Sequence, residues 1–295
     1  MKFKEILKSI YYRIIPKKIA INHIYNKICK EYVGTPIRWD NPQDLNEKIQ
    51  WLKINYDMTE WIRCADKYRV REYIIEKGLN NLLVPLYGVY NTADEIDFNL
   101  LPDSFVLKVN NGSGDCIIVH NKFNIDESMI RQQLNNFLNR KFGLFQAEYH
   151  YLSIPPLIVA EQLLSEDNNT GRALTDYKVW CFNGEPYCTF IVSDRNKDYI
   201  YMDLFDMNWN CINHNLSGSE HFRIGEGNIS KPKTFNLMME AAKKLSEGHP
   251  QVRVDFYEVN GKLYFGEMTF TSNGGYMRYF TPNFLLELGK KIKLY

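Results

Sequence analysis

The stretch "LPDSFVLKVNNGSGDCIIVH", residues 101–120, places two apolar segments on either side of a run of Asn, Gly and Ser. The segments "SFVLKVN" and "CIIVH" predict two strands, and the small residues between them predict a connecting loop. Such a loop can bring backbone N–H groups close to a phosphate, and Lys108 would add a positive charge beside it. An ordinary turn between two strands explains the same residues, so this stretch alone leaves both interpretations open.

Two common phosphate-binding loops are excluded here. A Walker loop has its lysine after the glycines and opens a helix, whereas Lys108 precedes Gly112 and Gly114 and a strand follows. The dinucleotide-binding pattern fails as well, because no third glycine opens a helix. A flexible loop between two strands remains.

Three other stretches carry charged residues at regular spacing. In "ADKYRVREYIIEKG", helical periodicity would put Lys67 and Arg71 on one side of a helix, unless they belong to a plain solvated face. The apolar strand "LIVAEQLL" contains Glu161, whose buried carboxylate needs a partner, either a nucleotide group or a structural cation. Asp176 and Lys178 alternate on the first strand of a hairpin that turns at Asn183-Gly184 and leads to Arg195, which could reach a phosphate.

The segment "VRVDFYEVNGKLYFGEMTF" predicts a second hairpin, around Asn260-Gly261. A two-residue turn would pair Asp255 with Gly266 and put Glu267 on the opposite face. A three-residue loop, residues 259–261, would instead place Glu267 opposite Arg253 and diagonal to Asp255, on one face. A magnesium site at these acids therefore requires the three-residue loop; otherwise the hairpin is solvent-facing with an Arg–Glu pair.

Composition bounds the class of protein. Hydrophobic residues at 45% and charged residues at 24% are typical of a globular chain, and a net charge of +1 gives no general case for nucleic acid. The six cysteines show no C-x-x-C or zinc spacing, which favours a reducing cytoplasm. We find no apolar run of membrane-spanning length and no signal-peptide core, so a cytoplasmic location is expected.

Residues 1–20, "MKFKEILKSIYYRIIPKKIA", form the one charge-biased segment. Its apolar residues follow helical spacing, and six basic residues face a single acid. Such a helix could lie on the anionic inner face of the plasma membrane, or its apolar stripe could pack on the main domain, which is the commoner case.

The order of these pieces resembles the ATP-grasp superfamily, and most closely its TupA-like branch, associated with cell-surface polysaccharide and teichuronopeptide synthesis. The resemblance runs over residues 41–270 and rests on "NPQDLNEKIQWLK", "DKYRVREYIIEKG", "LPDSFVLKVNNGSG", "DYKVWCFNGEPY" and the hairpin above. It implies an α+β fold in which two α+β subdomains grip ATP, preceded by a helical N-terminal region. The expected divisions are a basic helical segment (1–40), a helical pre-ATP region (41–100), a small subdomain with the glycine loop (101–158) and a C-terminal subdomain with the metal site (159–295).

The resemblance also implies roles for individual residues. The residues it places around ATP are Lys67, Lys108, Asn110, Gly112, Ser113, Gly114, Glu161, Asp176 and Lys178. It assigns Mg²⁺ to Asp255, Glu267 and Thr269, although many members have E-x-N where this chain has Glu267-Met268-Thr269. It places Arg195, Arg253 and Lys108 at the transferring phosphoryl group.

The implied activity is that of an ATP-dependent carboxylate–amine ligase using ATP and Mg²⁺. Its partners would be a polysaccharide or sugar-carboxylate acceptor and an amine such as an amino acid, with no nucleic acid. Two alternatives are a sugar kinase on the same ATP site, which would leave phosphate on the acceptor, and a glycosyltransferase, which would bind a nucleotide-sugar.

Overall fold

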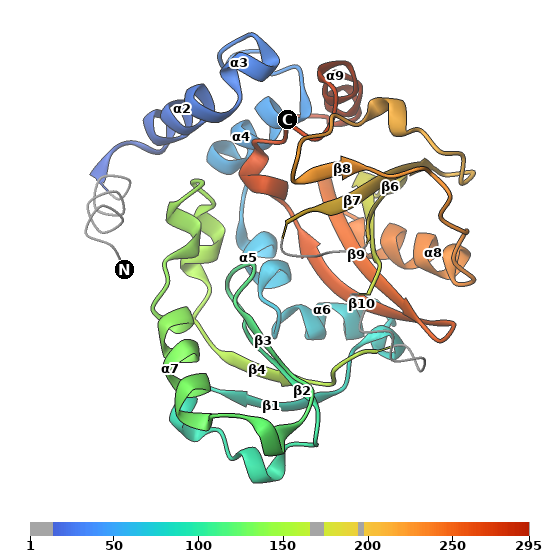
Figure 1. Cartoon of the computed structure of the whole chain (residues 1–295). Coiled ribbons are helices and arrows are strands. Elements are labelled where there is room, and N and C mark those ends of the chain that lie inside the picture. The colour runs from blue at the N-terminus through green and yellow to red at the C-terminus, as the bar shows by residue number, and fades with distance from the viewer. Residues whose placement is uncertain (1–13, 166–173, 194–197, 295) are drawn as a thin grey trace. The chain divides into compact units, whose positions relative to one another are not determined.

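The computed structural model describes residues 14–165, 174–193 and 198–294, which fall into two compact units (Figure 1). The first unit contains Asp57–Leu164 and the second contains Ile15–Tyr56 and Ser165–Tyr295. Most of the basic segment 1–20, with its expected membrane contact, lies outside the described residues, as does Arg195. Among the helices that are described, none has the length and apolar character needed to cross a bilayer.

The first unit is built on a four-stranded antiparallel sheet in the order β1-β4-β2-β3 (Figure 1). Its strands are β1 (Leu86–Tyr90), β2 (Phe105–Val109), β3 (Cys116–Val119) and β4 (Ile158–Glu161). Its helices are α5 (Thr59–Ala65), α6 (Val70–Glu76) and α7 (Glu127–Leu138). The strand–loop–strand unit predicted for residues 101–120 is confirmed, because β2 and β3 pair directly, with Lys108 opposite Cys116.

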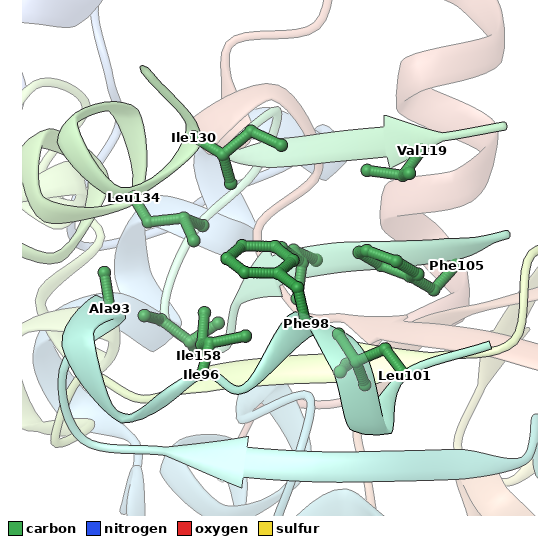
Figure 2. Close-up of a cluster of buried hydrophobic side chains, with 11 residues drawn as sticks. Ala93, Ile96, Phe98, Leu101, Phe105, Val119, Ile130, Leu134 and Ile158 are labelled. Carbon is green, nitrogen blue, oxygen red and sulfur yellow. The ribbon is translucent and has the colours of Figure 1, made fainter. Parts of the chain in front are cut away.

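One face of this sheet is covered by α7, and the core of the unit lies there (Figure 2). Alternation along β2 turns Phe105 and Leu107 into this core, where they meet Ile130 and Leu134 of α7. The side chains between them, including Lys108, therefore project from the other face.

The second unit contains a six-stranded sheet in the order β10-β9-β5-β6-β7-β8. Its pairs are antiparallel except for β7 with β8. The strands are β5 (Asp176–Phe182), β6 (Glu185–Ser193), β7 (Ile200–Asp206), β8 (Phe222–Ile224), β9 (Gln251–Val259) and β10 (Lys262–Thr269). The helices are α2 (Lys17–Ile28), α3 (Lys30–Val33), α4 (Leu45–Asn55), α8 (Phe235–Ser246) and α9 (Pro282–Lys291). The predicted turn at Asn183-Gly184 is confirmed, with both residues at positive φ as a two-residue hairpin turn requires.

Helix α4 begins later than its sequence indicates. The stretch "NPQDLNEKIQWLK" predicts a helix with Asn41 as its N-cap and Pro42 in its first turn, and this prediction is wrong because Asp44 caps the helix. The Asp44 carboxylate accepts the Glu47 N–H at 2.9 Å, and Glu47 reaches back to the Asp44 N–H at 3.3 Å, forming a capping box.

Burial makes this cap sensitive to pH. Burial raises the pKa of Asp44 to about 6, and the nearby Glu47 carboxylate adds to the effect. Because the folded protein then holds a proton more tightly than the unfolded chain, the charged carboxylate costs stability above about pH 6. That cost disappears as the pH falls toward 4.

The substitution Asp44→Asn is expected to raise the free energy of unfolding by about 1–3 kcal/mol at pH 8, since Asn keeps the cap without the buried charge. As the pH falls toward 4, the stabilities of the variant and the wild type should converge. Urea denaturation at the two pH values measures this, and equal stability at pH 8 would contradict it.

Candidate active site

The hairpin β9–β10 brings Asp255 and Glu267 together by a route that differs from the one expected. The turn has two residues, with Asn260 at φ 52° and Gly261 at φ 74°, so the three-residue loop is wrong. A β-bulge at Gly266 then shifts the register by one, and Glu267 lies directly opposite Asp255. The bulge therefore does what the longer loop was expected to do, and both carboxylates share one face.

Two buried cations hold the Asp255 carboxylate. Arg253 contacts it with Nε at 2.7 Å from Oδ1 and with Nη2 at 2.7 Å from Oδ2. Lys178, opposite Asp255 on β5, places its Nζ 2.5 Å from Oδ2 and 3.6 Å from Asp176. The alternation predicted for Asp176 and Lys178 thus places both on the strand face that carries Asp255.

The Arg253 guanidinium also links β10 to the loop that follows it. Its Nη2 lies 3.2 Å from Glu267 Oε1 and 3.1 Å from Thr269 Oγ1, and its Nη1 donates to Ser272 Oγ at 2.9 Å. Three oxygens, from Asp255, Glu267 and Thr269, therefore converge on one cationic nitrogen. This convergence defines the second-unit cluster.

Electrostatics keep the central groups of this cluster charged. Burial alone would raise the pKa of Asp255, but Arg253 and Lys178 outweigh it and hold that pKa below its usual value. Burial likewise opposes the charged form of Arg253, yet Asp255 and Glu267 hold its pKa above the usual range. Burial raises the pKa of Tyr279 to about 12, and burial with the Asp176 contact raises that of Tyr257, so both phenols stay neutral.

The oxygen set fits a divalent cation such as Mg²⁺. The three carboxylates of Asp176, Asp255 and Glu267 face the two cations Lys178 and Arg253, which leaves one negative charge over. No group of three or more His, Cys, Asp or Glu side chains within the described ranges could enclose a metal by itself. That is ordinary for Mg²⁺, which takes one or two carboxylates and completes its shell with water and phosphate oxygens.

A second charged group lies in the first unit, on the sheet face opposite the α7 core. Lys108 Nζ is 2.5 Å from Glu161 Oε2, and Arg71 Nη1 is 3.4 Å from Glu161 Oε1. Glu161 is 5% exposed, so these two cations are the partners that its burial requires. Lys108 itself keeps about a fifth of its side chain exposed, which leaves it able to contact a ligand.

The expected helix carrying both Lys67 and Arg71 is wrong, because the chain leaves the helix at Asp66 and resumes it at Val70. Asp66 explains the break, since its carboxylate accepts the N–H groups of Tyr68 and Arg69. Lys67 lies in this turn and donates from Nζ to the carbonyl of Gly112 in the glycine loop. The turn thus delivers Lys67 to the loop, which a continuous helix would not do.

Asn110 anchors the base of the loop. Its side chain is fully buried and donates to Asp66 at 2.9 Å and to the Pro155 carbonyl at 3.1 Å, while it accepts the Leu157 N–H at 2.7 Å. With its amide used in this way, Asn110 positions the loop. A direct contact between its side chain and a nucleotide is not what this geometry favours.

The two glycines of the loop are needed for different reasons. Gly114 has φ +78°, where a side chain would be strained, and Ser113 and Gly114 are exposed. Gly112 is buried, and a Cβ there would lie 3.2 Å from the Asp115 carboxylate and 3.3 Å from the Phe142 ring. The loop therefore has a packed base and an exposed tip.

Several contributors to the two clusters were not expected from the sequence. Ser272 and Tyr279 support Arg253, Tyr257 supports Asp176, and Asp66 shapes the turn that carries Lys67. Only Asp66 could have been found from the local sequence, because an Asp often accepts the backbone N–H groups two and three residues further on.

The fold and the two clusters define an α+β protein of the ATP-grasp type. The sequence model of the TupA-like ATP-grasp family matches residues 47–293, and the chain belongs to that family. The resemblance drawn from the sequence and the expected fold class are thereby confirmed.

Solved structures of similar fold include three ligases. D-alanine–D-alanine ligase from Bacillus anthracis shares 15% identity at a TM-score of 0.38, with 77% of this chain and 60% of that chain covered. The D-alanine–D-alanine ligase from Helicobacter pylori shares 13% identity at a TM-score of 0.42, with 85% of this chain and 67% of that chain covered. The ATP-grasp ligase PsnB, in complex with a precursor peptide and AMPPNP, shares 15% identity at a TM-score of 0.39, with 84% of this chain and 65% of that chain covered. The chain thus spans less than two thirds of the Bacillus anthracis ligase, and no match is found among curated proteins.

Proposed function

We propose that this protein is an ATP-dependent carboxylate–amine ligase that attaches an amino acid or another amine to a carboxylate of a cell-surface polysaccharide or its precursor. The observation that carries the proposal is the bulged register of β9 and β10, which converges oxygens of Asp255, Glu267 and Thr269 on Arg253 Nη2. Membership of the TupA-like ATP-grasp family supports the use of ATP. The association of that branch with cell-surface polysaccharide synthesis supports a polysaccharide as the acceptor.

The reaction needs two transfers and no protein nucleophile. A carboxylate oxygen of the acceptor attacks the γ-phosphorus of ATP, and the bond from that phosphorus to the β-phosphate oxygen breaks. ADP departs, and the acceptor now carries an acylphosphate. The amine nitrogen then attacks the acyl carbon, phosphate departs with the bonding electrons, and the nitrogen loses a proton as the amide forms. Catalysis of this kind consists mainly of positioning and charge stabilisation.

The residues of the chain supply those two requirements. We assign the phosphates to Lys67, Lys108 and the loop residues 112–114, whose lysines and backbone N–H groups suit anionic oxygens. Glu161 would accept a hydrogen bond from the adenine amino group. Asp176, with Lys178 beside it, would accept one from the ribose. Arg253 would stabilise the charge on the transferring phosphoryl group, a role we extend to Arg195.

Mg²⁺ would be held by Asp255 and Glu267, with Thr269 offering a hydroxyl oxygen. When bound, the ion supplies neutralisation of the phosphate charge. Arg253 already occupies the point where these oxygens meet, so the guanidinium must give up part of its contacts when the ion enters.

Glu267→Ala tests the proposal by calorimetry of ATP binding with and without Mg²⁺. We expect the wild type to bind ATP in a magnesium-dependent way and the variant to bind about 100-fold more weakly, because one of the two carboxylate ligands is gone. Glu240→Ala on α8 is the matched control, since it removes the same charge from an exposed helical position. A wild type that binds no ATP, or a variant that binds as well as the control, would contradict the assignment.

A further inference from the structure

A pocket beside the glycine loop is lined by residues to which no role is assigned above. It encloses about 210 Å³ within the first unit, between the loop and the segment that follows α7. The residues that give it its character are Asn111, Arg140, Lys141, Phe142, Tyr151 and Ser153. This volume is below the roughly 300–1,000 Å³ of sites for larger ligands, so it suits a single ring.

The charge of the pocket is positive. Among the described residues that line it, two are basic and none is acidic. Arg140 is paired with Asp115 at 2.7 Å but keeps 44% of its side chain exposed. Lys141 is exposed and forms no ion pair with a described residue, so its charge is available to an anion.

Two aromatic rings form part of the pocket wall. Phe142 and Tyr151 meet edge to face with their ring centroids 5.2 Å apart, and the Arg140 guanidinium lies 5.7 Å from the Phe142 ring. Aromatic surface combined with convergent polar groups is typical of sites that bury a ring and orient it by its substituents. Asn111 and Ser153 supply hydrogen-bonding groups for hydroxyls.

The pocket is also connected to the glycine loop. Asn111 belongs to both, the base of the loop at Gly112 packs on Phe142, and Asp115 at its end holds Arg140. An anion in the pocket would compete with Asp115 for Arg140. The loop would therefore respond to what the pocket contains.

We propose that this pocket binds a uronic acid ring of the acceptor, with its carboxylate on Lys141 and Arg140 and its ring against Phe142 and Tyr151. That the uronic acid belongs to the acceptor rests on the function proposed above, whereas the binding of a uronic acid ring rests on the residues of the pocket. A carboxylate neutralised by two cations is a poor nucleophile, so the ring held here is not the one that reacts. The acceptor is accordingly a polymer or oligomer that carries at least two carboxylates.

Saturation-transfer NMR on the full chain tests this, with D-glucuronate and D-glucose as directly observed probes and inorganic phosphate as a competitor of the glucuronate signal. The wild type should bind glucuronate more tightly than glucose or phosphate. Lys141→Ala should raise the glucuronate dissociation constant about 5- to 10-fold, the effect of losing one partly exposed charge contact. Lys244→Ala, an exposed lysine of α8 outside the pocket, should leave it unchanged.

A second variant should act in the opposite direction. Asp115→Asn removes the competing charge and frees Arg140, so it should lower the glucuronate dissociation constant. The proposal is overturned if Lys141→Ala binds glucuronate like the wild type, if Asp115→Asn binds it more weakly, or if glucose or phosphate binds as tightly as glucuronate.

Calorimetry with ATP and Mg²⁺ on the same samples separates this proposal from the proposed function. Lys141→Ala should keep the wild-type affinity for ATP while its affinity for glucuronate falls. A wild-type protein that binds glucuronate but no ATP would refute the ligase and leave the pocket assignment standing. Loss of ATP binding in Lys141→Ala would make the pocket part of the nucleotide site and refute the uronate assignment.

Discussion

Replacing Asp255 with alanine is expected to lower the free energy of unfolding by about 3–5 kcal/mol, because it strands two buried cations. Asp255 is 1% exposed, and its carboxylate is the shared partner of Arg253 and Lys178. Without it, Lys178 keeps Asp176 at 3.6 Å as its one ion-pair partner among the described residues. Arg253 keeps the more exposed Glu267 and the hydroxyls of Thr269, Ser272 and Tyr279. Urea denaturation followed by tryptophan fluorescence would measure the loss.

Two further variants separate this cause from general damage. Glu267→Ala removes a carboxylate that is 35% exposed, and we expect it to cost less than about 1 kcal/mol. The double variant Asp255→Ala, Lys178→Met removes one of the stranded cations and should recover part of the loss. If Asp255→Ala costs no more than Glu267→Ala, the buried charge cluster is not what stabilises this part of the second unit.

Lys108→Ala is expected to weaken ATP binding by about 30- to 100-fold, because a lysine contact to phosphate is a charge-assisted hydrogen bond worth roughly 2–3 kcal/mol. Lys108 lies on the face of β2 opposite the α7 core, and only Glu161 holds it at ion-pair distance among the described residues. Calorimetry with ATP and Mg²⁺ gives the affinity directly.

Lys122→Ala provides the comparison, since Lys122 also belongs to the first unit but donates to the carbonyl of Leu101 at 2.6 Å, away from the Lys108–Glu161 pair. Its affinity for ATP should match that of the wild type. If Lys108→Ala binds ATP within twofold of the wild type, Lys108 serves only to neutralise Glu161, and the phosphates are bound elsewhere.

Local patterns predicted the elements that carry these sites. Alternation of apolar residues around a run of small ones was enough to predict β2, the loop and β3, and Asn-Gly pairs were enough to locate two hairpin turns. Charged residues inside apolar strands, Lys108 and Glu161, signalled that each needed a partner. These features depend on residues within a few positions of one another, so a single sequence contains them.

Features that depend on close alternatives were predicted less well. Both Asn41 and Asp44 can cap a helix, and only Asp44 has a Glu three residues on, which the structure shows to be decisive. The helix expected to hold Lys67 and Arg71 breaks because Asp66 satisfies two backbone N–H groups that a longer helix would use.

The sequence by itself therefore determined β2 and β3, the positions of the two Asn-Gly hairpins, the family and which residues carry charge. Only the tertiary structure decided how those charges meet: the bulge at Gly266 that aligns Glu267 with Asp255, the pairing of Lys178 with Asp255 across 77 residues, and the burial of Asn110 between Asp66 and Pro155. A one-residue slip in a strand moves every side chain to the other face, and its cost is set by packing against strands distant in sequence. Residue propensities and spacing carry no information on this packing energy, and for this reason only the tertiary structure shows which charged side chains meet.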